Sequence, residues 1–162
     1  MRLIYPPRCT FCECIIPLSV DQLLCDECEE DYPCIEESLC QKCGKQINTE
    51  NYLCNDCSIA INFYEKGIAL YPYDGMIKEA LYRFKYGGRR KYAQFFAQMM
   101  VKQLEETDFY KEIDLIVPVP ISKERRIQRG YNQTEELARY ISKHTKIPWE
   151  KDILTRTKHT KP

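Results

Sequence analysis

Four Cys-x-x-Cys pairs within the first 57 residues constrain this chain more than any other feature of its sequence. The pairs are Cys9/Cys12, Cys25/Cys28, Cys40/Cys43 and Cys54/Cys57. Two cysteines separated by two residues can bind one tetrahedral ion, with each sulfur about 2.3 Å from zinc. A second pair returned by a short hairpin completes four-coordination. The repeated pattern therefore predicts a double zinc ribbon with one or two structural zinc ions.

The spacing of the pairs also indicates how the ligands divide between two sites. The intervening segments have hairpin length, so sequential sets are favoured over cross-braced ones. The predicted sets are Cys9, Cys12, Cys25 and Cys28, then Cys40, Cys43, Cys54 and Cys57. Gly44, directly after Cys43, suits the left-handed backbone of a metal knuckle. Cys14 and Cys34 are left over, and we interpret both as free thiols or small core residues.

A disulfide framework and redox-active Cys-x-x-Cys motifs are the alternatives to zinc. Disulfides need an oxidising compartment, and no apolar core of signal-peptide length precedes the first cysteine. A redox motif would normally occur once rather than four times. The sequence also contains no run of about 18 apolar residues. We therefore expect structural zinc in a cytoplasmic protein without a membrane span.

The net charge of zero hides a strong asymmetry along the chain. Residues 1–62 carry 4 Lys+Arg and 11 Asp+Glu, a formal charge of −7, whereas residues 63–162 carry a formal +7. All ten cysteines lie in the acidic part. This shift predicts two units, a double zinc ribbon over 1–62 and a second domain over 63–162. The acidity of the first unit argues against a nucleic-acid-binding zinc finger, because phosphate recognition needs a basic face.

The second unit alternates strand and helix patterns. Residues typical of strands occur over 66–73, 113–117 and 153–155, and apolar residues recur at helical spacing over 76–84 and from about 90 to 105. The run 113–117, IDLIV, fits a strand that is buried on both faces. Together with a helix after residue 131, this order predicts the start of an α/β layered domain.

The loop 118–131 follows the buried strand at its carboxyl end, where ligands bind in α/β sheets. Its charged residues, Lys123, Arg125, Arg126 and Arg129 against Glu124, give a local charge of +3. Gly130 would let the backbone approach a ligand, and the helix that Asn132 caps adds amide donors. These features predict a pyrophosphate or polyphosphate cradle. A solvated basic turn is an equally weighted alternative.

A second basic segment, residues 83–91 with the sequence RFKYGGRRK, contains no carboxylate. Aromatic residues interleave with its cations and could stack on the bases of single-stranded DNA. They are Tyr82, Phe84, Tyr86 and Tyr92. At helical spacing, however, Phe84 fits a core position better, and one or two of the tyrosines are expected to face solvent.

Taken together, these motifs resemble the ComF family of late-competence proteins. The resemblance rests on the four cysteine pairs, on YDGMIKEALYRFKYGGRRKYA over 73–93, and on DLIVPVPISKERRIQRGYNQTEELA over 114–138. The family joins a zinc ribbon to a type I phosphoribosyltransferase fold, so the resemblance implies that fold for residues 63–162. It also places the pyrophosphate side of a ligand site at the basic loop and the Phe-Lys-Tyr stretch. The predicted ligand-binding residues are Lys85, Tyr86, Arg125, Arg129, Gly130 and Asn132.

The resemblance implies a function as well. Family members are implicated in natural transformation, in which they act with a helicase-like partner to take in single-stranded DNA. An intact relative is expected to use Mg²⁺ and phosphoribosyl pyrophosphate, with the cationic loop stabilising the leaving pyrophosphate. A non-enzymatic zinc-stabilised module that binds single-stranded DNA or the helicase partner is the alternative.

The family pattern is incomplete in these 162 residues. The strand ending in Asp-Asp and the Thr-Thr-Gly loop of the phosphoribosyltransferase fold do not occur, so no residue is predicted to be catalytic and enzymatic activity is left open. The chain looks like the first two-thirds of a family member. An incomplete sheet has an unpaired edge, and self-association through that edge is expected.

Overall fold

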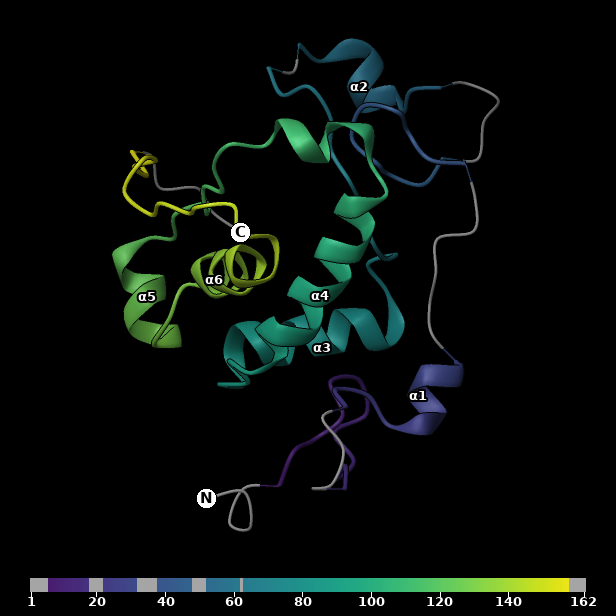
Figure 1. The fold of residues 1–162 in the computed structure, drawn as a ribbon, viewed down its shortest axis with the longest axis vertical. Coiled ribbons are helices and arrows are strands. Elements are labelled where there is room, and N and C mark those ends of the chain that lie inside the picture. The colour runs from purple at the N-terminus through teal and green to yellow at the C-terminus, as the bar shows by residue number, and fades with distance from the viewer. Residues whose placement is uncertain (1–5, 18–21, 32–37, 48–51, 62, 158–162) are drawn as a thin grey trace.

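The computed structural model describes residues 6–17, 22–31, 38–47, 52–61 and 63–157, which form a mostly helical protein (Figure 1). The helices are α1 (Asp26–Glu30), α2 (Asn55–Ile59), α3 (Gly75–Tyr86), α4 (Tyr92–Glu105), the 3-10 helix η1 (Asp108–Glu112), α5 (Lys123–Arg129) and α6 (Gln133–Thr145). In Figure 1, α3 and α4 lie between α1 at one end of the molecule and α2 at the other.

The predicted helices of the second unit are confirmed. Apolar residues at helical spacing give α3 and α4 buried faces, with Ile77, Ala80 and Phe84 on α3. α3 ends at Gly87, whose N–H donates to the carbonyl of Arg83. α4 crosses against α6 (Figure 1), and Ala97 of α4 shares a small apolar cluster with Ile141 of α6.

The basic loop contains a helix that the sequence analysis missed. Ser122 caps α5, because its hydroxyl accepts from the N–H of Arg125 at 3.3 Å. α5 ends at Gly130, which has the left-handed φ of 75° typical of glycine after a helix. Asn132 then caps α6 as predicted, and its side-chain oxygen accepts from the N–H of Thr134 at 3.2 Å.

The expected α/β fold is not confirmed. Among the described residues, the predicted strand over 113–117 contributes only one parallel bridge, between Ile116 and Trp149. The expected strands over 66–73 and 153–155 are wrong, because neither segment lies in a β-bridge. The segment 66–73 is instead held to a cysteine knuckle, where the N–H of Gly67 donates to the carbonyl of Lys42 at 2.7 Å. A strand forms only where an extended neighbour pairs with it.

The largest core joins the N-terminal ribbon to α3 and α4. Phe11 lies edge-on against Phe95 of α4, with 5.2 Å between the ring centroids. Phe84 of α3 contacts the rings of Phe96 and Tyr131, with 5.9 Å between centroids in each pair. The first ribbon therefore shares its core with the helices, whereas the second ribbon has a small cluster of its own around Cys40, Ile47 and Cys54.

An apolar cleft of about 340 Å³ opens beside this core. It lies between α3, α4, α6 and the segment 68–73, and aliphatic and aromatic side chains line it. In the described part of the chain no helix has the length and apolarity needed to cross a membrane.

We predict that Phe84→Ala lowers the free energy of unfolding by about 3 to 5 kcal/mol, because Phe84 is only 2% exposed and the substitution leaves a cavity. Urea unfolding followed by circular dichroism measures this loss. The control is Tyr82→Ala on the same helix, at a side chain that is 65% exposed, with an expected loss under about 0.5 kcal/mol. Equal losses in the two variants would contradict the proposed core.

Candidate metal centres and a candidate anion-binding surface

The two halves of the cysteine-rich segment are structural repeats. Each begins with a knuckle closed by an antiparallel bridge, Arg8 with Ile15 in the first and Leu39 with Gln46 in the second. The N–H of Cys9 donates to the carbonyl of Cys14 at 2.9 Å, and the N–H of Cys40 donates to the carbonyl of Lys45 at 2.8 Å. Cys14 and Lys45 therefore occupy equivalent positions in the two knuckles.

Both knuckles turn through a residue with a left-handed backbone. Glu13 has φ of 62° in the first, and Gly44 has φ of 72° in the second. A Cβ atom at Gly44 would lie 2.6 Å from the backbone nitrogen of Ala69, so glycine is required there by packing as well as by φ. The special role predicted for Gly44 is thus explained by its place in the knuckle.

The second pair of each ribbon sits at the start of a short helix. Cys25 precedes α1 and Cys54 precedes α2, and both have extended backbones before the first helical turn. One turn later, Cys28 and Cys57 point back toward the knuckles, which follows from the spacing of three residues on a helix.

In the second ribbon the structure brings together all four predicted ligands. The Sγ atoms of Cys40, Cys43, Cys54 and Cys57 lie within 4.8 Å of one another. Hydrogen bonds at the backbone of Cys54 lower the pKa of Cys40 to about 6, which favours its thiolate. Burial and neighbouring thiols raise the pKa of Cys57 to about 12. Four sulfurs this close repel one another when ionised, so a soft divalent cation such as zinc fits the donor set.

In the first ribbon five thiols gather instead of the predicted four. The Sγ atoms of Cys9, Cys12, Cys14 and Cys25 lie within 4.8 Å of one another. Burial, together with contacts to three of these thiols, raises the pKa of the predicted ligand Cys28, so it adjoins the same cluster. The interpretation of Cys14 as a small core residue is wrong, because Cys14 is exposed beside the cluster. Cys34 lies outside the described residues.

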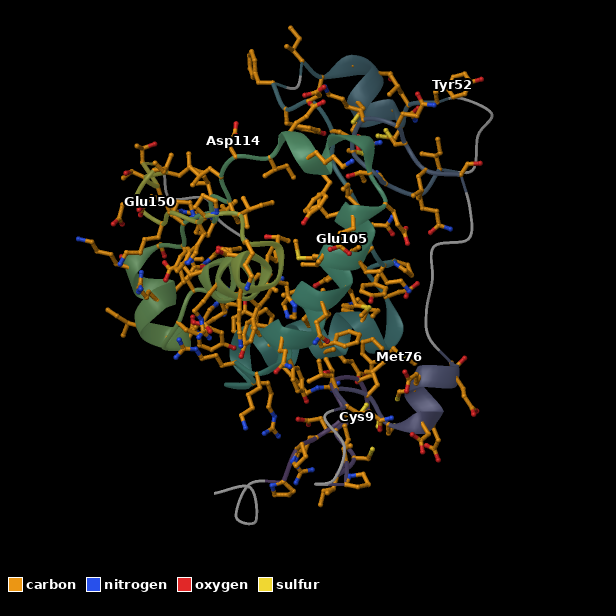
Figure 2. The ribbon with its side chains drawn as sticks, viewed as in Figure 1. Cys9, Tyr52, Met76, Glu105, Asp114 and Glu150 are labelled. Carbon is orange, nitrogen blue, oxygen red and sulfur yellow. The ribbon has the colours of Figure 1, made fainter. Side chains whose placement is uncertain are left out.

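The two ribbons lie at opposite ends of the helical unit, as the labelled Cys9 and Tyr52 show in Figure 2. Three contacts tie the first ribbon to the basic segment 83–91 and the start of α4. Arg83 donates to the carbonyl of Phe11, Arg89 donates to the carboxylate of Glu13 at 2.6 Å, and the hydroxyl of Tyr92 donates to the carbonyl of Cys9 at 3.3 Å.

These contacts correct the view of residues 83–91 as an open basic cluster. Arg83 also pairs with Glu79, and Arg89 and Arg90 pair with Glu13 and Glu136. Three of the cations are therefore committed to structural ion pairs. Helical spacing is compatible with the pair of Glu79 and Arg83, but no local pattern indicates the other two pairs, because Glu13 lies 76 residues from Arg89 and Glu136 lies 46 residues from Arg90.

Two predicted ligand residues, Tyr86 and Arg129, meet at the end of α3. The Nη2 of Arg129 donates to the hydroxyl of Tyr86 at 2.8 Å, and the guanidinium lies 4.6 Å from the ring centroid. Tyr82 lies next to Tyr86, with 5.0 Å between ring centroids. Tyr82 and Tyr86 are exposed. We define Tyr82, Lys85, Tyr86, Arg125 and Arg129 as the tyrosine–arginine surface.

Asn132 and Gly130 have structural tasks of their own. Asn132 is 2% exposed, and its side chain caps α6 while donating to the carbonyl of Val119 at 3.3 Å. Gly130 ends α5. The backbone carbonyl of Lys85 accepts from the side-chain amide of Gln133 at 3.3 Å, which links the end of α3 to the start of α6. Arg125 lies on α5 and is half-buried.

Comparison with known proteins gives two kinds of match. Residues 1–58 match the family model of the double zinc ribbon domain. The chain is 28% identical to competence protein ComFC of Streptococcus pneumoniae over 79% of its length, and 26% identical to competence protein F of Haemophilus influenzae over 84%. The predicted resemblance to the ComF family is confirmed. The double zinc ribbon is confirmed with it.

The comparisons also set the extent of the relationship. The chain covers 56% of the Streptococcus ComFC and 66% of the Haemophilus protein. It is 22% identical, over 98% of its length, to the DNA utilization protein YhgH of Escherichia coli, of which it covers 70%. No solved structure matches the chain.

Glu136 provides a test of the contacts around α6. It is 5% exposed, and although burial opposes its ionisation, hydrogen bonds from Arg90 and Arg139 outweigh burial and lower its pKa below the usual 4.5. A lowered pKa stabilises the native state above pH 4.5, and this stabilisation is lost as pH falls through the native pKa. We predict that Glu136→Gln lowers the free energy of unfolding by about 1 to 2 kcal/mol at pH 7.

The measurement is urea unfolding of both proteins between pH 7 and pH 3, where the difference should shrink as the pH falls. Glu79→Gln is the control, since Glu79 pairs with Arg83 at a side chain that is 70% exposed. Its expected cost is about 0.5 kcal/mol or less. A Glu136→Gln deficit that did not depend on pH would contradict the ion-pair account.

Proposed function

We propose that this chain acts in the uptake or utilisation of DNA and binds single-stranded DNA through the tyrosine–arginine surface. The names of its relatives, competence proteins and DNA utilization proteins, support the process. The observation that carries the binding mode is the stacking of Arg129 on the exposed ring of Tyr86, next to Tyr82.

The chemistry of this surface suits a single strand. Exposed aromatic rings accept bases by stacking without regard to sequence, and neighbouring guanidinium and ammonium groups attract phosphates. The Nε of Arg129 is buried and has no hydrogen-bond partner within the described ranges. Lys85 and Arg125 add positive charge at the same end of α3 and on α5.

The ribbons serve this function through structure. We infer two zinc ions, one held by Cys9, Cys12, Cys25 and Cys28 and the other by Cys40, Cys43, Cys54 and Cys57. Cys28 and Cys57 occupy equivalent places on α1 and α2, which supports this division. Four thiolates per ion leave no open coordination position, so the zinc replaces a hydrophobic core that such short segments cannot build.

A pyrophosphate or phosphoribosyl ligand is the second candidate for the basic loop. The parallel bridge between Ile116 and Trp149 favours it, since the helices α5 and α6 connect these two extended segments, as a helical crossover does in an α/β unit. The loop 118–132 then lies beyond the carboxyl end of the first segment. Mg²⁺ would accompany such a ligand, and Arg125 and Arg129 would neutralise its charge. No catalytic residue is assigned.

Two further partners stay predictions. The resemblance implies a helicase-like competence protein, and the open edge expected of an incomplete sheet implies a second copy of the chain. Cytoplasmic location also stays a prediction.

The test of DNA binding is fluorescence anisotropy with a labelled oligothymidylate at two salt concentrations. Tyr86→Ala and Arg129→Ala are each expected to weaken binding by about tenfold, because one stacked base is worth about 1 to 3 kcal/mol. Binding should also weaken as salt rises, since phosphate contacts release counterions.

Arg126→Ala is the matched control. It removes the same charge from the same helix, but Arg126 is committed to Glu135 through both terminal nitrogens, at 3.1 and 3.2 Å. Equal losses for Arg126→Ala and Arg129→Ala would show that only net charge matters and would refute the surface. Calorimetric titration with phosphoribosyl pyrophosphate and Mg²⁺ tests the second candidate, and binding of that ligand without binding of DNA would favour it.

A further inference from the structure

The first metal centre contains a thiol that its ribbon does not need. The repeat aligns Cys14 with Lys45 of the second ribbon, because the carbonyl of each accepts from the N–H of the first cysteine of its knuckle. Lys45 pairs with Asp56 at 3.1 Å, and the second centre is complete with four cysteines. The ribbon architecture thus requires no sulfur at the position of Cys14.

The surplus thiol lies in contact range of two predicted zinc ligands. The Sγ atoms of Cys12, Cys14 and Cys25 all lie within 4.8 Å of one another, and Cys12 and Cys25 are 3.6 Å apart. Cys12 and Cys14 are exposed, whereas Cys9 and Cys28 are buried. An oxidant in solution can therefore reach Cys12 and Cys14 directly, but not the two buried cysteines.

We propose that the first zinc centre is a peroxide-sensitive site in which Cys14 is the resolving thiol. This inference rests on zinc binding by the ribbons and is independent of DNA binding. The second centre lacks an equivalent thiol among the described residues. Its zinc ion is therefore retained when peroxide is added and has a structural role only.

The chemistry needs a peroxide as the oxidant and balances in two steps. The thiolate of Cys12 attacks one peroxide oxygen, so the O–O bond breaks, hydroxide leaves and a sulfenic acid forms. The thiol of Cys14 then attacks the sulfenic sulfur, an S–S bond forms and water leaves with the thiol proton. Two thiol sulfurs are oxidised and one peroxide is reduced. Cys12 ceases to be a thiolate donor, and zinc is released. The same two steps at Cys25 in place of Cys12 give a disulfide between Cys25 and Cys14.

The contacts of the first ribbon give this step a consequence outside the centre. Glu13, between Cys12 and Cys14, holds Arg89, and the carbonyl of Cys9 accepts from Tyr92. Phe11 lies in the core beside Phe95. Loss of the first zinc would therefore loosen the segment that connects α3 to α4.

The experiment measures zinc release from the full chain with a chromogenic chelator as hydrogen peroxide is added. Zinc per chain is counted first by elemental analysis. We expect peroxide to release one zinc ion per chain quickly while the other is retained, and mass spectrometry should find Cys14 in a disulfide with Cys12 or Cys25. Cys14→Ser should bind as much zinc as the original chain and lose the rapid phase.

Lys45→Cys is the complementary variant. It places a thiol at the equivalent position of the second ribbon, so peroxide should now release both zinc ions quickly. The proposal is overturned if Cys14→Ser releases zinc at the original rate, or if Cys14→Ser binds one zinc ion fewer, since Cys14 would then be a ligand. A chain that holds no zinc before peroxide is added would instead refute zinc binding itself.

Discussion

Two clusters of thiols, one in each ribbon, are the constraint on which the rest of the structure depends. Their segments are short and rich in carboxylates, so hydrophobic burial alone cannot hold them. We infer that metal coordination fixes each knuckle against its short helix. In the first ribbon that fixed knuckle presents Phe11 to the helices, and the ring becomes part of the core formed by α3 and α4.

The helical unit then positions the candidate ligand surface. The hydroxyl of Tyr131 donates to the carbonyl of Phe84, which ties the segment after α5 to the end of α3. This contact brings Arg129 over Tyr86. Ion pairs occupy the three arginines of the 83–91 segment and Arg126 of α5. Lys85, Arg125 and Arg129 form no ion pair with a carboxylate among the described residues, so the surface is defined by which cations are left unpaired there rather than by charge density along the sequence.

Local patterns predicted much of this molecule. The spacing of cysteines indicated the ribbons, apolar periodicity indicated α3 and α4, and Asn132 marked the start of α6. Pairings over long distances could not be predicted. No residue near Arg89 in the sequence predicts its ion pair with Glu13. The apolar run IDLIV is compatible with a buried strand, but it does not determine whether a neighbouring strand is present to pair with it. The position of Cys14 beside the first thiol cluster could have been predicted, because an alignment of the two knuckles in the sequence places Cys14 opposite Lys45.

We infer that each thiol cluster holds zinc through four sulfurs. X-ray absorption at the zinc edge of the purified full chain tests it most directly. The account predicts two zinc ions per chain, with four sulfur neighbours each at about 2.3 Å and no oxygen or nitrogen ligand. A coordination shell containing oxygen or nitrogen, or a chain that folds without zinc, would contradict it.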